Sequence, residues 1–585
     1  MTRRFLLFCA LPLACLAQTF SFTVSMPRPA SHVFHVAMRC DGLAGEFQDF
    51  KMPVWMPGYY RILDYARNVA GFRAADAAGR ALPWEKVAKN TWRVATGGSA
   101  AVAVDYDVTG TIRFAAQNYL AEDRAHVAPP GMFLHVAGKL GRPATVTLQP
   151  PEGWKSVATG LDPVPGRANT YSAADFDVLY DSPILIGSQE VLRFDLRGVP
   201  HEVALENVPA GVDRDRMLAD LKRMVEAATA LIGEIPYKHY TFLMMGQGNG
   251  GIEHLNSASI LFNGSTLTTA EGYQRWLSYV AHEYFHNFNV KRIRPIALGP
   301  FDYDRENLTN MLWVSEGLSV YYQDIVCLRA GLVTREQYLE KMRNSIQRFE
   351  NASGHRYQSA AESSWNTWGT SGVGNDRNTT ISYYDNGAML GALLDLAIRH
   401  ASENARSLDD VMRALYRKYY REKQRGFTDA EFRAECESAA GQPLAEVFEY
   451  ASSTKEMDYA KYFAWAGLEV SATAGEGKGV WLGANLQSQD AALAVTDVAP
   501  GSPAQKAGLR AGDAIDAIDG TPKPTVKLLS DTLAAKKAGD RLRLKLAGRE
   551  IEAELAPAPQ WTYAIRPMPS ASSGQIRTGE AWLGK

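Results

Sequence analysis

Cysteine is scarce in this sequence, and its scarcity excludes a disulfide-stabilised fold. Only five cysteines occur among 585 residues. Two of them, Cys9 and Cys15, lie in an N-terminal segment that we expect to be removed. The other three, Cys40, Cys327 and Cys436, are odd in number and widely spaced, so they fit neither a disulfide framework nor a cysteine-based zinc motif. Stability should therefore come from apolar cores, to which Cys327 is expected to belong.

An excess of charge of either sign is also absent. The chain carries 62 Lys and Arg against 64 Asp and Glu, a formal net charge of −2, and no basic block. Nucleic acid is therefore not expected as a partner. No run of about 20 apolar residues follows the N-terminal segment, so stable membrane insertion is not expected either. What is present is an ordinary globular composition, 46% hydrophobic and 22% charged, over a length that predicts about three domains.

The first 17 residues have the pattern of a secretory signal peptide. Arg3 and Arg4 precede an apolar run over residues 5–17 that is too short to span a bilayer. Small residues at the end of this run offer a cleavage site before Gln18. We therefore expect an exported protein, periplasmic in the first instance, with secretion as the alternative.

Residues 18–204 have the residue pattern of a β-rich domain. Short alternating runs, such as residues 20–25 and 101–106, are separated by turns rich in Gly, Pro and Asp. This pattern predicts a sandwich-like N-terminal domain. Residues 52–60 are rich in aromatic residues and proline. We favour a rigid packed turn there over a substrate contact, and both interpretations stay open.

Residues 205–455 change to helical periodicity. An amphipathic helix is expected over residues 213–232, and apolar strands over residues 239–245 and 257–262. Residues 351–380, rich in Ser, Gly, Asn and Trp, predict a long loop of the kind that serves as a lid or a binding loop.

Further helices are indicated by their start and stop signals. Thr-x-x-Glu or Thr-x-x-Gln patterns predict helix starts at Thr268, Thr334 and Thr428. Another helix is expected over about residues 310–330, with Gly331 as its stop.

The pattern changes again over residues 475–557. The segment over residues 498–520 closely resembles the signature of bacterial PDZ domains, which add an extended peptide to a sheet edge and capture a chain-terminal carboxylate. The alternative is a PDZ fold used only for packing. Residues 558–585, rich in Pro and Ser, are expected to form a C-terminal tail. The candidate carboxylate loop comprises Trp481, Leu482, Gly483 and Ala484.

Residues 282–286 read His-Glu-Tyr-Phe-His, an HExxH motif. On a helix, His282 and His286 lie on one face, one turn apart, where a single Zn²⁺ can take both imidazoles. Glu283 follows the first ligand, at the position of a general base for water activated by zinc. The alternative is a surface helix with two incidental histidines.

Two histidines do not complete a catalytic zinc site, which needs three protein ligands and one open position. Trp313-Val-Ser-Glu316-Gly lies on the next expected helix, 30 residues after His286. An antiparallel return of that helix would bring the Glu316 carboxylate to the metal. A solvated helix residue is the alternative for Glu316.

These elements resemble the glycyl aminopeptidase family of gluzincins that carry a PDZ domain, which is related to the aminopeptidase N family. The resemblance rests on residues 282–295 and on Trp313–Gly317, and it covers nearly the whole chain after the signal. It implies a multidomain α+β protein: a β-rich N-terminal domain, a mainly helical thermolysin-like zinc domain and a C-terminal PDZ domain. It also implies one Zn²⁺ per chain.

The resemblance further implies a substrate-binding element and an oxyanion donor. Gly250-Gly251-Ile-Glu253-His254 is similar to the Gly-x-Met-Glu-Asn element of aminopeptidase N relatives, whose Glu binds the substrate's free amine, although His254 stands where those relatives have Asn. Tyr384 takes the place of the tyrosine that stabilises the tetrahedral oxyanion.

Two assignments around these elements stay open. Tyr383, next to Tyr384, is the alternative oxyanion donor. Lys291, Arg292 and Arg294 either bind a substrate carboxylate or, as we favour, neutralise helix ends and acidic neighbours.

The sequence thus predicts a zinc aminopeptidase that removes N-terminal residues from peptides; a preference for Gly or Ala follows from the resemblance alone. One alternative is a zinc endopeptidase or oligopeptidase in which the PDZ domain gathers substrate. A second is a non-enzymatic peptide-binding protein, against which the presence of all four residues His282, Glu283, His286 and Glu316 argues.

Overall fold

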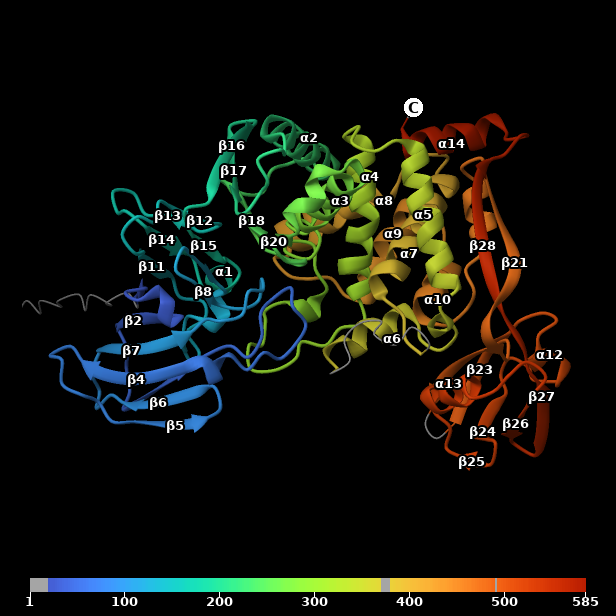
Figure 1. The fold of residues 1–585 in the computed structure, drawn as a ribbon, viewed down its shortest axis with the longest axis horizontal. Coiled ribbons are helices and arrows are strands. Elements are labelled where there is room, and N and C mark those ends of the chain that lie inside the picture. Colours follow the sequence, from blue (N-terminus) through green and yellow to red (C-terminus); the bar gives the residue numbers. More distant parts are fainter. Residues whose placement is uncertain (1–18, 370–378, 490–491, 585) are drawn as a thin grey trace, which may run out of the picture. The chain divides into compact units, whose positions relative to one another are not determined.

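The computed structural model describes residues 19–369, 379–489 and 492–584 (Figure 1). The chain divides into two compact units. The signal peptide predicted over residues 1–17, and residues 370–378 of the predicted 351–380 loop, lie outside the described residues. The units comprise Met1–Pro57 with Leu63–Gln189, and Gly58–Ile62 with Glu190–Lys585.

The first unit is built from β-sheets, as predicted. Its largest sheet has seven strands in the order β13-β14-β11-β1-β2-β7-β4, with β1 parallel to β11 and antiparallel to β2. Alternate residues of β2 are buried, which is the pattern that indicated strands. The strands of this sheet are β1 (Thr19–Ser25), β2 (Val33–Asp41), β4 (Val69–Asp76), β7 (Ala101–Thr109), β11 (Ala144–Gln149), β13 (Asp162–Pro163) and β14 (Thr170–Ala173).

Two four-stranded sheets complete this unit, in the orders β10-β3-β6-β5 and β12-β15-β9-β8. Phe22 and Phe133 meet in the core, with ring centres 4.9 Å apart. The strands are β3 (Phe47–Lys51), β5 (Trp84–Ala88), β6 (Thr91–Ala95), β8 (Tyr119–Leu120), β9 (Arg124–Val127), β10 (His135–Val136), β12 (Ser156–Thr159) and β15 (Ile184–Gly187), and the unit's helix is α1 (Phe176–Tyr180).

The second unit opens with a five-stranded sheet that carries part of the site. Its order is β16-β17-β18-β20-β19, so β19 (Gly250–Glu253) is an edge strand, antiparallel to β20 (Ser257–Phe262). Every residue of β18 (Tyr240–Gly246) and β20 is buried, which explains their apolar runs. The first two strands are β16 (Glu190–Leu196) and β17 (Val199–Leu205), so this unit begins before the domain start expected at residue 205.

Helices pack around this sheet, and most of their predicted starts are confirmed. Helix α2 (Arg214–Ile232) is capped by the Asp213 side chain. Thr334 and Thr428 form the capping boxes of α5 (Arg335–Glu350) and α9 (Asp429–Ala440).

One predicted start is wrong by a residue. Thr269, not Thr268, caps α3 (Ala270–Phe285), because its hydroxyl accepts the N–H of Gly272. Thr268 instead ends a short 3-10 turn.

The helix predicted over residues 310–330 divides into two parts. A π-helical turn, Trp313–Gly317, precedes α4 (Leu318–Arg329). Gly331, at φ 65°, follows the helix end as expected. The other helices of this domain are α7 (Tyr383–Ala401), α8 (Leu408–Leu415), α10 (Ala445–Ser452) and α11 (Tyr459–Ala464), and a second π-helical segment is Tyr416–Glu422.

The prediction of an unstructured loop over residues 351–380 is corrected for its described part. Helix α6 (Ala360–Trp365) begins there with a capping box of Ser359 and Glu362. The Ser364 hydroxyl accepts the Trp313 N–H at 3.0 Å, so this segment supports the π-helical turn.

The C-terminal part contains the predicted PDZ-type sheet, in the order β22-β23-β24-β26-β27 with β25 paired to β24. Two long antiparallel strands, β21 and β28, connect it to the helices, and Figure 1 shows them side by side. The expected tail forms β28 and α14, whose Trp582 is 1% exposed. The elements are β21 (Leu468–Trp481), β22 (Ala484–Gln489), β23 (Ala492–Val498), α12 (Pro503–Lys506), β24 (Ala514–Ile518), β25 (Thr521–Pro522), α13 (Val526–Ala534), β26 (Arg541–Leu546), β27 (Arg549–Glu554), β28 (Ala556–Pro567) and α14 (Ser573–Leu583).

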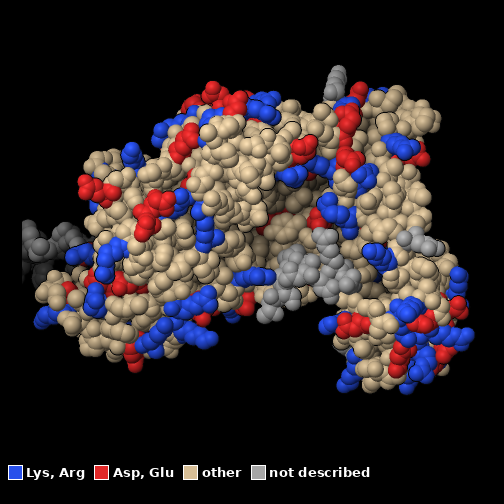
Figure 2. Space-filling model, in the orientation of Figure 1, with Lys and Arg blue, Asp and Glu red and all other residues tan. Residues whose placement is uncertain are grey.

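Charged side chains of both signs occur on the surface. Figure 2 shows basic and acidic side chains intermingled over the face in view. Among the described residues, no helix combines the length and apolarity needed to cross a bilayer. Cys40, Cys327 and Cys436 are free and buried, so Cys327 is a core residue as expected.

Candidate active site

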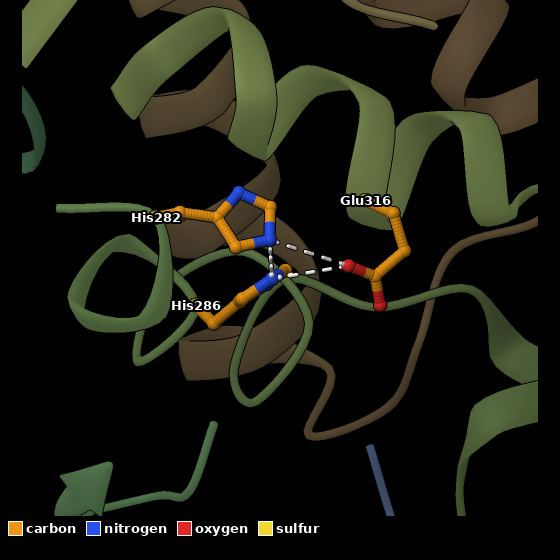
Figure 3. Close-up of side chains that lie close together, drawn as sticks. All are labelled: His282, His286 and Glu316. Atoms are coloured by element: carbon orange, nitrogen blue, oxygen red, sulfur yellow. Dashed lines mark hydrogen bonds and ion pairs between the residues drawn. The ribbon is translucent and has the colours of Figure 1, made fainter. Parts of the chain in front are cut away.

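The two histidines of the HExxH motif converge at the end of α3. His282 lies in the last turn and His286 caps the helix. Their Nε2 atoms are 3.0 Å apart, and both rings are buried (Figure 3). The four-residue spacing therefore places both imidazoles at one point, as the motif predicts.

Glu316 reaches the same point from the π-helical turn. Its Oε2 lies 3.1 Å from His286 Nε2 and 3.7 Å from His282 Nε2. Ligand atoms about 2.1 Å from a tetrahedral zinc are about 3.4 Å apart, and the three separations bracket that value. These residues form the one group of His, Cys, Asp and Glu in the described chain whose atoms could hold a metal ion. The donor set therefore fits zinc.

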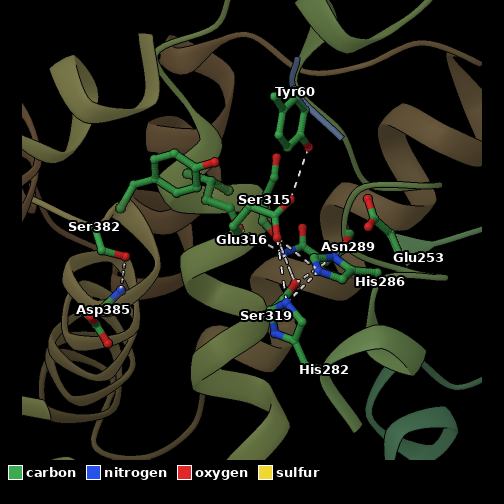
Figure 4. A network of polar contacts seen from close by, with 12 residues as sticks. Tyr60, Glu253, His282, His286, Asn289, Ser315, Glu316, Ser319, Ser382 and Asp385 are labelled. Atoms are coloured by element: carbon green, nitrogen blue, oxygen red, sulfur yellow. Dashed lines mark hydrogen bonds and ion pairs between the residues drawn. The ribbon is translucent and has the colours of Figure 1, made fainter. Parts of the chain in front are cut away.

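Neighbouring groups fix the His286 ring for such a role. Its Nδ1 is 2.7 Å from the Asn289 carbonyl oxygen and 3.2 Å from the Ser319 hydroxyl. Donation from Nδ1–H to that carbonyl leaves the Nε2 lone pair for a metal. The Asn289 amide in turn donates to the Ser315 carbonyl at 2.9 Å, which links the loop after α3 to the π-helical turn (Figure 4).

Tyr60 holds the other oxygen of Glu316. Its hydroxyl donates to Glu316 Oε1 at 3.1 Å, and Figure 4 shows it approaching that carboxylate. Oε2 is thereby left to face the imidazoles. Packing, as predicted for residues 52–60, therefore does not account for the whole segment. Trp55 and Met56 are fully buried, but the segment also ends at the candidate metal ligand.

Two glycines let the tyrosines of α7 approach the metal ligands. A Cβ on Gly317 would lie 2.4 Å from Gly387 Cα, and one on Gly387 would lie 2.4 Å from the Trp313 carbonyl oxygen. Any side chain at either position would separate the π-helical turn from α7. The N-terminal turn of α7, which carries Tyr383 and Tyr384, is therefore held against the site.

The structure distinguishes between these tyrosines. Tyr384 is partly exposed, and its ring centre lies 6.2 Å from that of His282. Tyr383 is 1% exposed, and its hydroxyl lies 3.1 Å from Thr367 Oγ1. The Tyr383 hydroxyl also hydrogen-bonds Tyr384. Of the two candidate donors, Tyr384 therefore lies beside His282, and Tyr383 packs behind it.

Glu283 belongs to α3, and its carboxylate faces the edge strand β19. A Cβ on Gly251 would lie 2.7 Å from Glu283 Oε1 and 2.8 Å from the Tyr279 hydroxyl. Tyr279 hydrogen-bonds Glu283. Gly251 is therefore required to let the strand pass over this carboxylate, a packing reason that the sequence did not indicate.

Glu253, at the end of β19, is a buried carboxylate with an available oxygen. It is 4% exposed, and its Oε1 has no hydrogen-bond partner among the described residues. Lys291 Nζ is 4.0 Å from that oxygen. A Cβ on Gly58, at φ +89°, would lie 2.9 Å from both carboxylate oxygens, so the loop that carries Tyr60 closes over Glu253.

The other residues predicted for this element are placed differently. Gly250, at φ 107°, begins β19 and is partly exposed. His254 is completely buried, so its ring belongs to the interior of the protein.

Charges within the site influence one another strongly. Burial opposes protonation of His286, but Glu316, Glu253 and Glu283 outweigh it and raise the pKa of His286 to about 10. Burial alone would raise the pKa of Glu316, yet His286 and His282 hold it well below its usual range. Burial lowers the pKa of His282 and raises that of Glu283 to about 8. The charges of the metal-free site therefore favour a protonated His286 beside an ionised Glu316.

The predicted carboxylate loop lines a cavity of about 260 Å³. Trp481 and Leu482 line it together with Leu533 of α13 and with Arg356 and Tyr357, which lie between α5 and α6. Gly483 (φ 79°) and the buried Ala484 turn the chain into β22.

Three family models match the chain. The Peptidase M61 N-terminal domain matches residues 21–188, M61 glycyl aminopeptidase matches residues 275–390, and the PDZ domain matches residues 480–552. The chain therefore contains M61 N-terminal and M61 glycyl aminopeptidase domains, followed by a PDZ domain. The family prediction is thereby confirmed, as are its three-part architecture and its class, a peptidase.

Solved structures resemble this M61 chain. The crystal structure of an aminopeptidase N family protein from Idiomarina loihiensis matches 96% of this chain and 100% of that chain, with 27% identity and a TM-score of 0.76. A mutant M1 zinc metallopeptidase from Deinococcus radiodurans, bound to a Tyr-Ser-Ala substrate, matches 75% of this chain and 95% of that chain, with 12% identity and a TM-score of 0.50. The second likeness shows a shared fold alone. No curated protein matches the sequence.

Sequence reasoning did not assign Tyr60, Tyr279, Asn289 and Ser319 to this M61 site. The signal that could have found Tyr279 and Ser319 was helical spacing. Tyr279 lies four residues before Glu283 on α3, and Ser319 lies three residues after Glu316. Tyr60 carried no comparable signal, because it is 256 residues from its partner.

Proposed function

We propose that this protein is a zinc aminopeptidase that removes small N-terminal residues, Gly or Ala, from peptides. The observation that carries the proposal is the convergence of His282, His286 and Glu316 beside a buried carboxylate, Glu253. The family description, glycyl aminopeptidase, supports the preference for small residues.

Glu253 is the proposed anchor for the substrate's free amine. A buried carboxylate with an unpartnered oxygen attracts an ammonium group through a charge-assisted hydrogen bond. Because Gly58 closes over the same carboxylate, a chain end fits there better than a continuing chain. The edge strand β19 would pair with the substrate backbone and lead it towards the histidines.

The proposed mechanism assigns one task to each remaining residue. His282, His286 and Glu316 would hold zinc, which when bound would supply Lewis-acid activation of the scissile carbonyl and of water. Glu283 takes a proton from the attacking water and passes it to the leaving amine. The Tyr384 hydroxyl donates a hydrogen bond to the oxyanion that develops on the former carbonyl oxygen. Tyr279 and Tyr60 position Glu283 and Glu316, respectively.

Two further assignments are part of the proposal. The protein is exported to the periplasm, as its N-terminal pattern indicates. Its PDZ loop, Trp481–Ala484, would take peptide C-termini, for which Arg356 beside Trp481 offers a cation.

The proposal is tested with a panel of chromogenic aminoacyl substrates, each free and N-acetylated, before and after treatment with a chelator. We expect cleavage of free Gly and Ala substrates, loss of cleavage on acetylation, and loss on chelation that zinc restores. Equal cleavage of free and acetylated peptides would instead identify a zinc endopeptidase.

A further inference from the structure

A cationic cavity lies in the second unit, and the proposed chemistry does not use it. The cavity has a volume of about 290 Å³. Its basic lining residues are Lys291, Arg292, Arg294, Arg421 and Arg425, and no acidic residue lines it. The first three belong to the basic motif after the HExxH helix.

Three of the five cations have carboxylate neighbours outside the cavity. Arg421 pairs with Glu234, and Arg425 pairs with Glu431 at 2.6 Å. Lys291 approaches Glu253, as described above. These carboxylates do not line the cavity, so the charge that faces its interior stays positive.

Arg292 is buried and forms no ion pair among the described residues, although the Glu234 carboxylate interacts with it electrostatically. Arg292 is 3% exposed, and it donates to neutral acceptors only: the carbonyl oxygens of Leu255, Asn287 and Pro236 and the amide oxygen of Asn256. Its Nε has no partner among the described residues. A buried cation whose hydrogen-bond partners are all neutral is unfavourable, and a bound anion would offset that cost.

Arg294 supplies the unengaged donors of the cavity. Its guanidinium group lies 5.7 Å from the centre of the Phe301 ring. In the described part of the chain, it forms no ion pair and no side-chain hydrogen bond with a protein acceptor. Gly299 leaves it room, because a Cβ there would lie 2.2 Å from the guanidinium carbon. The group is thus held in place by packing, with its N–H donors available.

We propose that this cavity binds a phosphate group, either free phosphate or a phosphate monoester. Its donors come from two segments of the chain: the loop with Arg292 and Arg294, and the segment with Tyr420 and Gln424. Donors that converge from several directions suit the four oxygens of a tetrahedral anion better than a planar carboxylate. Guanidinium groups also match phosphate oxygens in paired hydrogen bonds. The basic motif is therefore an anion site and not only a neutraliser of acidic neighbours.

The test is isothermal titration calorimetry of the whole protein with inorganic phosphate, at constant ionic strength in chloride. We expect one site per chain, and binding weaker by at least about tenfold in Arg294→Ala, because a charge-assisted contact is lost. Arg292→Ala is avoided because four acceptors would lose their donor. Arg417→Ala is the matched control. Arg417 lies in the π-helical segment that also holds Arg421 of the cavity. Its side chain is 68% exposed, and it does not line the cavity.

Two further ligands test which kind of phosphate the cavity binds and whether it prefers a tetrahedral anion. Binding of glycerol 3-phosphate as well as phosphate supports a monoester site, and binding of phosphate alone supports a site for the free ion. Succinate, a flexible dianion with two planar carboxylate groups, should bind at least about tenfold more weakly. Equal binding of succinate, no phosphate binding, or an unchanged affinity in Arg294→Ala would overturn the proposal. None of these readouts depends on peptidase activity.

Discussion

The hydroxyl of Tyr60 donates a hydrogen bond to Glu316 Oε1 at 3.1 Å, across 256 residues of sequence. The contact joins the loop 58–62 to the candidate metal site and selects which oxygen of Glu316 faces His282 and His286. In the proposed mechanism Tyr60 is a positioning residue, because it would act on a bound metal only through Glu316.

Tyr60→Phe should weaken zinc binding by about ten- to a hundredfold, because a carboxylate ligand loses the contact that orients it. Competition titration against a zinc-binding dye measures this. Tyr119→Phe is the control, since it removes a phenol hydroxyl from a strand of the first unit. Equal zinc affinity in wild type and Tyr60→Phe would show that Glu316 is oriented without Tyr60.

Glu283→Gln should retain zinc and lose about two to four orders of magnitude in kcat, because the base is removed and the ligands remain. Metal content and turnover of Gly-p-nitroanilide are measured on the same sample. Glu271→Gln, at an exposed position in the first turn of the same helix, should behave as wild type. Near-normal turnover in Glu283→Gln would contradict the assigned mechanism.

Glu253→Gln should reduce kcat/KM for free-amine substrates by about ten- to a hundredfold, because a charge-assisted contact becomes a neutral one. N-acetylated peptides have no ammonium group, so any residual cleavage that survives acetylation should not change. The ratio of the two rates is therefore the readout. If the ratio of free-amine to N-acetylated cleavage stays at the wild-type value, Glu253 does not anchor the amine.

Zinc binding should release about one proton per site at pH 8. The pKa of His286 is raised to about 10 in the metal-free protein, so its imidazole is protonated at that pH and must lose the proton before Nε2 can bind a metal. Calorimetry in two buffers of different ionisation enthalpy measures the release, which should disappear above about pH 10. Absence of proton release at pH 8 would mean that the metal-free pair is already neutral.

The raised pKa of His286 also predicts how the stability of the metal-free protein depends on pH. A raised pKa stabilises the folded state below the ordinary pKa of histidine, about 6.5. This contribution is lost as pH rises through about 10, the value in the folded protein. Thermal denaturation of the metal-free protein between pH 6.5 and 10 should show the decline.

Gly317→Ala should destabilise the protein by about 1–3 kcal/mol, because the new methyl group would lie 2.4 Å from Gly387 Cα and force two helices apart. Denaturant unfolding measures the loss. Gly211→Ala, where a Cβ would meet nothing within 4 Å, is the control. Equal stability of the two variants would show that the crossing can widen without cost.

Local signals in the sequence predicted the elements well. Amphipathic spacing indicated α2, capping patterns indicated α5 and α9, and HExxH placed two imidazoles together, because each depends on residues within one or two helical turns. The errors were also local. Thr269 rather than Thr268 caps α3, and the cap of α6 was hidden in a segment whose composition suggested a loop.

The sequence by itself determined the order of the domains, the helix of the HExxH motif and the identity of the three candidate ligands. Only the tertiary structure decided that Tyr60 orients Glu316, that Gly251 passes over Glu283, and that Tyr384 rather than Tyr383 faces His282. The physical reason is the range of the interactions. Periodicity and caps are written in neighbouring residues, whereas these contacts join segments far apart in the chain, and only close packing brings those segments together.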